Sequence, residues 1–312
     1  PERSVRPFRP TARTVLTALL VLVGCQGSED PPSSDGEIAR SPELESRIEE
    51  LAQLSQGRAG VAVIHVESGR SVLVDADQPL PLQSVFKLPL AVEILREVAD
   101  GRLQLDQTVT VKAKDRAPGV ASNQKKWETV PRDVSVEQLL EYSLVDSDNT
   151  SSDVLLERLG GPSALTRRMA ALGFPGIQVN AETKAMGSEG ALPNVGTAEA
   201  LAELLASLQR GEALPPAQRD LLWALMSRAR TGERRIRGRL PEGTPVLDKT
   251  GTGRNGSATN DVGIVTLPDG RGHLAIAVLL AGSSRPGNEQ EDLIAEVALA
   301  AFKGFAQESA AP

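Results

Sequence analysis

The sequence predicts an α/β protein of the α+β kind, in which the two ends of the chain build one antiparallel sheet. Short runs rich in strand-forming residues lie near both ends, at 61–66 and 71–74 and again at 246–252, 261–267 and 273–281. Between them, from about residue 100 to 240, the periodicity is mostly helical. This order predicts a sheet flanked by helices, with an all-helical lobe inserted in the middle. A binding site is expected in the cleft between the two parts.

The composition is that of a soluble globular protein. The chain has 312 residues, of which 40% are hydrophobic and 24% are charged, enough to build one or two domains with a full core. The formal net charge is -7, and lysine and arginine are scattered along the chain rather than massed. A nucleic-acid partner is therefore not expected. The chain is expected to be a monomer.

The first 25 residues have the features of an export signal. Four arginines, at positions 3, 6, 9 and 13, precede an apolar run over 15–23 that is too short to span a membrane as a stable helix. The sequence Leu-Val-Gly-Cys that ends at Cys25 resembles the lipobox of bacterial lipoproteins. That resemblance implies cleavage before Cys25 and a diacylglycerol on its sulfur. Cys25 is the only cysteine, so no disulfide can form within the chain.

These features predict three segments. Residues 1–24 form the signal peptide, 25–40 form the lipidated cysteine and a flexible polar tether, and 41–308 form the folded domain, with the helical lobe at about 100–240. We expect the protein on the periplasmic side of a bacterial membrane, held there by its lipid. The alternatives are a plain signal peptide, which would leave a soluble periplasmic protein, or a buried thiol at Cys25.

The domain opens with a helix and a hairpin. Apolar residues between Pro42 and Leu54 recur at three- and four-residue spacing, which predicts a surface helix. The strands at 61–66 and 71–74 are joined through a short turn containing Gly69. His65 and His273 lie in separate strand runs without a cluster of other ligands, so both are expected to be structural, and no metal or cofactor is expected.

A serine and a lysine three residues apart stand where the next helix begins. Apolar residues follow Lys87 at helical spacing, and Pro89 is compatible with a helix that starts at about Val85. Ser84 then lies at the helix N-terminus on the same face as Lys87, and an amine of lowered pKa could take the serine proton. This pattern alone is weak, because it is expected about once by chance in a chain of this length. A second copy occurs at Ser122 and Lys125.

Four helices and one long irregular segment are predicted in the middle of the chain. Ser135 and Gln138 form a capping-box pattern that opens the first of these helices. The segment over 174–196 has little periodicity, and loops of that length inside a domain usually carry function. The four helices are predicted at 135–144, 151–159, 197–208 and 216–229. A closing helix is predicted at 289–305, after the last strand.

Two further motifs complete a set with Ser84 and Lys87. The tripeptide Ser147-Asp148-Asn149 lies in the turn between two predicted helices, and Lys249-Thr250-Gly251-Thr252 lies on a predicted strand. Each is weak alone, but the three motifs in this order and at these separations are expected by chance in only about one chain in a thousand.

With these motifs the chain resembles the class A serine β-lactamases, within the wider group of penicillin-recognising serine enzymes. The resemblance runs from about Pro42 to Phe305, so 41–308 is expected to be a β-lactamase catalytic domain with the β-lactamase/transpeptidase-like fold. The pentapeptide Gln-Ser-Val-Phe-Lys around Ser84, and Trp127 ahead of the second motif, look more like the cephalosporinase and extended-spectrum branch.

The resemblance implies a role for each matching residue. Ser84 attacks the lactam carbonyl, and Lys87 and Ser147 carry its proton to the departing nitrogen. The N–H groups of Ser84 and Thr252 form the oxyanion hole. Asn149 holds Lys87 and the side-chain amide of the substrate. The substrate-binding residues implied in this way are Asn149, Thr250, Gly251, Thr252 and Trp127, and Lys249 both binds the substrate carboxylate and helps to keep Lys87 neutral.

Hydrolysis of the acyl-enzyme needs a carboxylate that activates water. Glu182 in the long irregular segment matches the family's spacing to the next helix, with a solvated loop acid as the alternative. Four residues later the family usually has asparagine, and this chain has Met186. The family's usual arginine after the third motif is also missing, and Arg235 stands where some members carry a substitute. A guanidinium suits bidentate carboxylate binding, although Arg235 could also be a plain surface arginine.

The sequence thus predicts a serine β-lactamase that hydrolyses the cyclic amide of penicillins or cephalosporins through an acyl-enzyme and confers antibiotic resistance. Two alternatives remain at this point. A DD-peptidase or penicillin-binding protein shares the acylation residues but lacks the loop carboxylate. A lipoprotein that binds β-lactams without turnover is the other.

Overall fold

The computed structural model of the chain describes residues 42–119, 121–185 and 192–307. The predicted signal peptide, Cys25, the tether and Met186 lie outside the described residues. None of the helices in the described part of the chain is long and apolar enough to cross a membrane.

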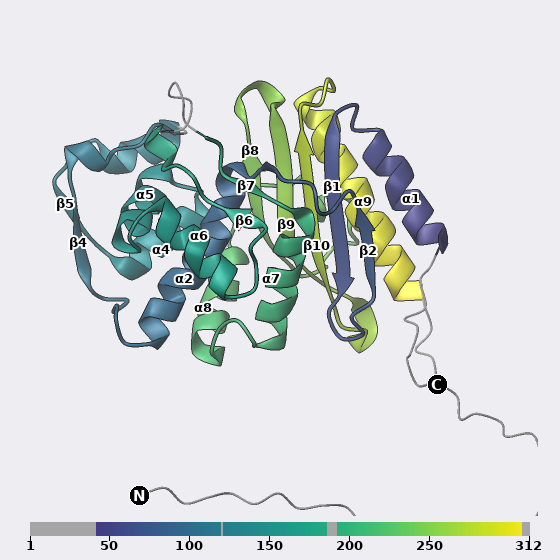
Figure 1. The fold of residues 1–312 in the computed structure, drawn as a ribbon, viewed down its shortest axis with the longest axis horizontal. Helices are drawn as coiled ribbons and strands as arrows, with labels where there is room; N and C mark the ends of the chain where they lie inside the picture. The colour runs from purple at the N-terminus through teal and green to yellow at the C-terminus, as the bar shows by residue number, and fades with distance from the viewer. Residues whose placement is uncertain (1–41, 120, 186–191, 308–312) are drawn as a thin grey trace, which may run out of the picture. The chain divides into compact units, whose positions relative to one another are not determined.

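Both ends of the folded domain contribute to one five-stranded antiparallel sheet, as predicted (Figure 1). Its order is β2-β1-β10-β9-β8, so the last three strands of the chain lie beside the first two. Val61 pairs with Val278 in the centre of the sheet, and Lys249 pairs with Val262 near its β8 edge. The strands are β1 (Arg58–His65), β2 (Ser71–Val74), β8 (Val246–Thr252), β9 (Ala258–Thr266) and β10 (His273–Ala281).

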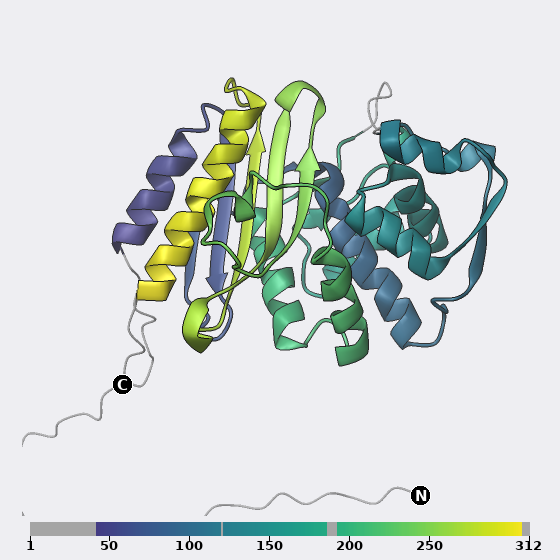
Figure 2. The same ribbon diagram turned by 180° about the vertical axis from the view of Figure 1, so that it is seen from behind.

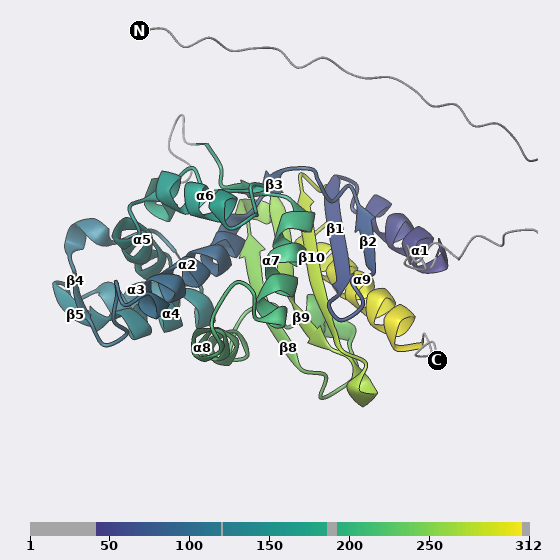
Figure 3. The ribbon, with the colours of Figure 1, turned by 60° about the horizontal axis from the view of Figure 1, so that its bottom comes forward.

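Helices cover both faces of this sheet, because its central strands are apolar on both sides. Val61 and Val63 belong to the apolar cluster shared with α1 (Pro42–Gln53) and α9 (Gly287–Gln307), which lie side by side on one face (Figure 2). Ala62, between them, belongs to the cluster that includes α7 (Ala198–Arg210) on the other face (Figure 3). This alternation fits the two-residue repeat of a strand that is buried on both sides.

The inserted lobe is built around α2 (Lys87–Ala99), the helix that follows the predicted nucleophile. Apolar side chains surround α2 because α4, α5, α6 and α8 all pack against it. Their bounds are α4 (Val136–Val145), α5 (Asn149–Arg158), α6 (Pro162–Ala171) and α8 (Pro216–Met226).

The structure corrects three details of the predicted lobe. It is not wholly helical, because β4 (Thr108–Val111) and β5 (Arg132–Ser135) form a two-stranded sheet within it. Helix α6 is additional to the prediction. Its first residue is Pro162, which lacks only an N–H that would be unpaired in a first turn. Helix α7 packs on the large sheet rather than in the lobe.

The remaining elements are short. The predicted irregular segment over 174–196 contains two of the strands of a three-stranded sheet, β3 (Leu80–Pro81), β6 (Ile177–Gln178) and β7 (Val195–Gly196). A single helical turn, α3, spans Ala121–Gln124. The 3₁₀ helices are η1 (Gln83–Phe86), η2 (Ala113–Asp115), η3 (Lys125–Trp127), η4 (Thr183–Ala185), η5 (Ile236–Arg239), η6 (Arg254–Gly256) and η7 (Pro268–Gly270).

Candidate active site

A cavity of about 650 Å³ lies between the β8 edge of the large sheet and the helical lobe. Its wall combines residues from η1, from the turn between α4 and α5, from β8 and from the segment that follows α8. The predicted site residues that line it are Ser84, Ser147, Asn149, Arg235, Thr250 and Thr252. Segments far apart in the sequence therefore meet at this cavity, as the three motifs predicted.

Ser84 is presented to the cavity by a 3₁₀ turn rather than by the first turn of an α-helix. The turn η1 spans Gln83–Phe86, and α2 begins only at Lys87, two residues later than predicted. Strand β8 packs directly against η1, and this close approach explains Gly251. A Cβ at Gly251 would lie 2.4 Å from the carbonyl oxygen of Leu82, so any larger residue would push β8 away from Ser84.

The Lys87 side chain is fully buried and points to the second motif. Its Nζ donates hydrogen bonds to the Ser147 carbonyl oxygen at 2.6 Å, to Ser147 Oγ at 3.3 Å and to Asn149 Oδ1 at 2.7 Å. These contacts link α2 to the turn between α4 and α5.

A second buried amine approaches the same hydroxyl from the sheet. Lys249 Nζ lies 3.0 Å from Ser147 Oγ and donates to the Thr250 carbonyl oxygen at 2.8 Å. Ser147 Oγ is therefore within hydrogen-bonding distance of both amines. Of the predicted residues, Lys87, Ser147 and Lys249 form one continuous network, and Ser147 lines the same cavity as Ser84.

Burial lowers the pKa of both lysines. For Lys87 the pKa falls well below its usual 10.5, first because burial removes water from the charged form and second because Lys249 is also a cation. Burial also lowers the pKa of Lys249, to about 8, although the nearby Asp261 and Asp248 oppose the shift. The lowered pKa biases Lys87 toward a neutral amine, which can accept a proton.

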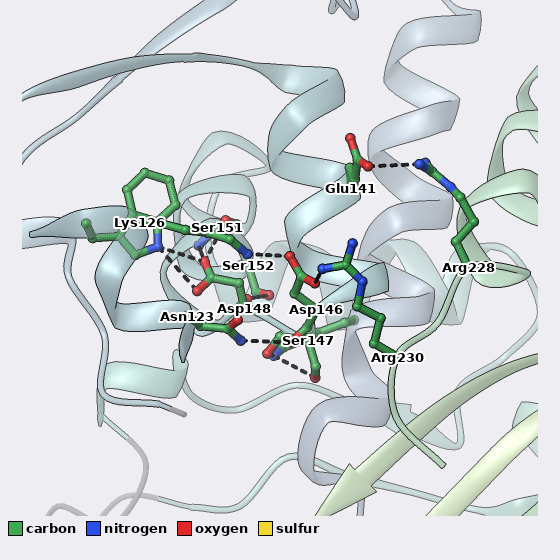
Figure 4. A network of polar contacts seen from close by, with 12 residues as sticks. Asn123, Lys126, Glu141, Asp146, Ser147, Asp148, Ser151, Ser152, Arg228 and Arg230 are labelled. Carbon is green, nitrogen blue, oxygen red and sulfur yellow. Dashed lines mark hydrogen bonds and ion pairs between the residues drawn. The ribbon is translucent and has the colours of Figure 1, made fainter. Parts of the chain in front are cut away.

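The turn that carries Ser147 is held in an unusual backbone conformation. Ser147 has φ +55°, in the left-handed region, and Asp148 caps the N-terminus of α5 by accepting the Ser151 N–H at 2.7 Å (Figure 4). Helix α5 therefore starts two residues earlier than predicted. Trp127 Nε1 also donates to Asp148, at 3.1 Å.

The structure does not place Trp127 at the wall of the site cavity. Its side chain is fully buried, and it is not among the residues that line the cavity. Its edge-to-face contact with Tyr142 and its hydrogen bond to Asp148 place it in the core behind the Ser147 turn. It supports the site from behind the cavity wall.

Arg235 lines the cavity wall and contacts the end of β8. Its Nη2 donates to Thr252 Oγ1 at 2.7 Å, and its Nη1 donates to the carbonyl oxygens of Gly251 at 3.1 Å and Asn260 at 2.8 Å. It also pairs with Glu291 at 3.1 Å. These contacts exclude the alternative of a plain surface arginine, because the Arg235 side chain is only 6% exposed.

The structure does not bring the Glu182 carboxylate to the wall of the site cavity. Its neighbour Thr183 lines that cavity, whereas Glu182 lines a second cavity beside α6. The Glu182 carboxylate pairs with Lys184 Nζ at 2.8 Å. Asp153 on α5 holds the same turn by accepting the backbone N–H groups of Thr183 at 2.7 Å and Lys184 at 2.9 Å. The role of Glu182 stays a prediction.

The three motifs do not point to several residues that shape this site. Asp146 and Glu291 line the cavity, and the Thr231 hydroxyl lies 2.7 Å from that of Thr250. Asp153 belongs with them, because it fixes the Glu182 turn. Asp146 adjoins the second motif and could have been noticed for that reason, but the other three depend on contacts between distant segments.

The two histidines lie away from the site. His273 Nδ1 is 2.6 Å from Glu67 Oε1, and His65 Nδ1 is 2.7 Å from Ser68 Oγ. Among the residues that the structure describes, no three His, Cys, Asp or Glu side chains form a group suited to a metal ion.

Comparisons with known proteins agree with this geometry. The sequence model of the beta-lactamase enzyme family matches residues 43–305. The extended-spectrum beta-lactamase PER-1 of Pseudomonas aeruginosa is 36% identical over 273 residues, which cover 85% of this chain and 88% of that protein. The crystal structure of the TLA-1 extended-spectrum beta-lactamase is similar with a TM-score of 0.81 at 29% identity, over 85% of this chain and 99% of that one.

An ancestral class A beta-lactamase is also similar, with a TM-score of 0.76 at 33% identity over 84% of this chain and 99% of that one. The transpeptidase-like fold and the class predicted from the three motifs are therefore confirmed. The chain belongs to the beta-lactamase enzyme family, as a class A serine enzyme that hydrolyses β-lactams.

Proposed function

We propose that the chain opens the lactam ring of penicillins and cephalosporins by acylation on Ser84 and then hydrolyses the acyl-enzyme. The observation that carries this assignment is the position of Ser147 Oγ, 3.3 Å from Lys87 Nζ and 3.0 Å from Lys249 Nζ in a cavity that Ser84 also lines. A hydroxyl between two amines of lowered pKa can relay a proton.

In the acylation step the neutral Lys87 amine takes the proton of Ser84 Oγ, and Oγ forms a bond to the lactam carbonyl carbon. The carbon–nitrogen bond of the ring then breaks. Ser147 Oγ gives its proton to the departing nitrogen and regains one from the Lys87 ammonium. The N–H groups of Ser84 and Thr252 stabilise the oxyanion in this proposal.

Cationic and hydroxyl groups on the sheet side of the cavity are proposed to bind the substrate carboxylate. Thr250 and Thr252 lie on β8, and Arg235 reaches Thr252 Oγ1 at 2.7 Å. Lys249 adds a second cation beneath them. Asn149 holds Lys87 through Oδ1, and its amide is proposed to meet the side-chain amide of the substrate.

Hydrolysis of the ester at Ser84 is assigned to a water activated by Glu182. Glu182 takes a proton from the water, the water oxygen attacks the ester carbon, and the proton returns to Ser84 Oγ as the ester bond breaks. The contact between the Glu182 turn and α5 supports this assignment, because Thr183 on that turn lines the site cavity. The carboxylate must leave Lys184 to act.

Two variants test the proposal with a chromogenic cephalosporin and intact-protein mass spectrometry. Ser84→Ala should abolish hydrolysis and form no adduct. Glu182→Gln should form the adduct and release it slowly, since only the second step needs the carboxylate. A long-lived adduct on the wild-type protein would instead indicate a penicillin-binding protein. Unchanged hydrolysis by Ser84→Ala would overturn the assignment of the nucleophile.

We also propose that the protein is a monomeric lipoprotein of the periplasmic side with extended-spectrum activity. The Leu-Val-Gly-Cys sequence at Cys25 supports the lipid anchor, and the similarity to PER-1 and TLA-1, both named extended-spectrum enzymes, supports the substrate range.

Each part of this proposal has its own test. Cys25→Ala should move activity from the membrane to the soluble fraction. Size-exclusion chromatography of the chain from residue 41 tests the monomer, and rates with a penicillin, a cephalosporin and a carbapenem test the range.

A further inference from the structure

We propose that Asp146 is a positioning residue that holds Ser147 Oγ between the two amines, and that Lys126 and Arg230 clamp its carboxylate for this purpose. The proposal rests on the proton-relay role of Ser147 given above. It concerns three residues to which the acylation chemistry assigns no part.

The Asp146 carboxylate is a nearly buried anion with a cation on each oxygen. Arg230 Nη1 donates to Oδ1 at 2.9 Å, and Lys126 Nζ pairs with Oδ2 (Figure 4). The carboxyl side chain is only 12% exposed. The Asp146 carbonyl oxygen is also fixed, because Asn123 Nδ2 donates to it at 2.8 Å. A charged group that is largely removed from water is held firmly by such charge-assisted bonds.

The residue that follows Asp146 needs this support. A left-handed φ of +55° at Ser147 costs a residue with a Cβ about 1 kcal/mol or more, so the neighbouring contacts must maintain it. On its C-terminal side Asp148 is fixed by Trp127 and by a hydrogen bond from its own N–H to the Tyr142 carbonyl oxygen at 2.9 Å. On the N-terminal side the corresponding support is Asp146.

The two cations come from different parts of the molecule. Lys126 belongs to η3 of the lobe and lies 4.4 Å from the centre of the Tyr142 ring, which limits its movement. Arg230 belongs to the segment after α8, and its backbone N–H donates to the Val145 carbonyl oxygen at 3.1 Å. The next residue, Thr231, contacts Thr250 on β8. Through Arg230 and Thr231, the Ser147 turn is therefore connected to β8, the strand that carries Lys249.

The effect of the clamp is geometric rather than a charge effect on the lysines. The charged side chains that shift the pKa of Lys87 are Lys249, Asp148 and Asp153. Those that shift the pKa of Lys249 are Asp261, Asp248 and Arg235. Asp146 belongs to neither set. A displacement of a relay group by about 1 Å can cost about 10²-fold in rate, so removal of the clamp should slow acylation at unchanged lysine basicity.

The test compares Asp146→Ala, Arg230→Ala and the matched control Arg228→Ala by single-turnover acylation. Arg230 and Arg228 are both exposed, at 75% and 53%, and Arg228 pairs with Glu141 on α4 instead (Figure 4). We expect Asp146→Ala to lower the acylation rate by about 10²-fold. The substrate dissociation constant and the pH at half-maximal rate should not change. Arg230→Ala should act in the same direction but by a smaller factor, because the Arg230 side chain is 75% exposed. Asp146→Glu should restore part of the rate, and Arg228→Ala should match the wild type.

Ser147→Ala separates this proposal from the one on which it rests. If Asp146 acts through Ser147, the double variant Asp146→Ala/Ser147→Ala should be no slower than Ser147→Ala alone. A wild-type rate for Asp146→Ala, or a further loss in the double variant, would overturn the positioning role while Ser147→Ala remained slow. A wild-type rate for Ser147→Ala would overturn the relay itself. Thermal unfolding of each variant excludes a general loss of fold.

Discussion

Two regions of the site are held in place in very different ways. The wall around Lys87, Ser147 and Lys249 is fixed by contacts between residues 60 to 102 positions apart, and both amines are fully buried. Glu182, in contrast, pairs with Lys184 two positions along the chain, and both of these side chains are partly exposed.

This difference indicates where the site is preorganised. Buried partners from separate elements cannot exchange without moving the helices and strands that carry them, so the acylating wall is rigid. A partly exposed ion pair contributes about 1 kcal/mol or less and can open readily. In the proposed mechanism, acylation therefore uses the resting geometry of the site, whereas the hydrolytic step requires a local rearrangement at Glu182.

The largest effect on the acylation rate should come from replacing Lys87 in the buried amine network. Lys87→Met fills nearly the same volume but cannot accept the serine proton, so acylation should slow by about 10² to 10⁴-fold. Intact-protein mass spectrometry should show little adduct, in contrast to Glu182→Gln, which should accumulate adduct. If Lys87→Met acylated at the wild-type rate, the base would have to be another group.

The pH dependence of acylation should show how far the positive charge of Lys249 lowers the pKa of Lys87. Lys87 must be neutral to act, and Lys249 lowers its pKa, so Lys249→Met should move the acid limb of kcat/KM to higher pH. Wild-type KM should rise above about pH 8, since Lys249 then loses the charge that binds the substrate carboxylate. Loss of that bond should raise KM about 10- to 10²-fold. Profiles of kcat/KM for both proteins test this, and an unmoved acid limb in the variant would contradict it.

The rigid wall is also the region that the sequence predicted best. Short motifs identified Ser84, Lys87, Ser147 and Lys249, because each role demands a particular residue type at a fixed spacing. Trp127 was predicted at the cavity from the resemblance to a family. Such a resemblance does not show whether an aromatic side chain lines a cavity or fills the core, and here the packing against Tyr142 places it in the core.

The fold shows the same limit. Runs of strand-forming residues predicted the large sheet, and apolar residues at helical spacing predicted α1 and α9. The capping-box pattern at Ser135 predicted the start of α4. Helix α6 was missed because Gly160-Gly161-Pro162 is typical of a helix end, although proline is equally suited to the first position of the next helix. The direction of the Glu182 carboxylate depends on Asp153 and Lys184 together, which no local pattern specifies.

A smaller effect is expected at Asp153, which links the two regions. Asp153→Ala removes the acceptor of the Thr183 and Lys184 N–H groups, and unpaired buried N–H groups should lower the free energy of unfolding by about 1–3 kcal/mol. Deacylation should slow more than acylation, because the Glu182 turn loosens while the amine network stays. Urea unfolding and the two rate constants test this. Asp153→Asn, which keeps one acceptor, should be intermediate, and an equal loss in both rates would contradict the division between the regions.

The smallest effect on stability should come from Lys184→Gln, which breaks the local pair itself. Because Lys184 is 36% exposed and Glu182 24%, the free energy of unfolding should change by about 1 kcal/mol or less. A pair of that strength can lower the population of free Glu182 carboxylate by at most about fivefold. Deacylation should therefore become up to about fivefold faster, at an unchanged acylation rate. Lys184→Arg keeps the cation and should behave as the wild type. Slower deacylation in Lys184→Gln would mean that the lysine positions Glu182 for hydrolysis rather than restraining it. The Glu182 side of the site would then be preorganised as well, and its proposed difference from the buried amine network would be contradicted.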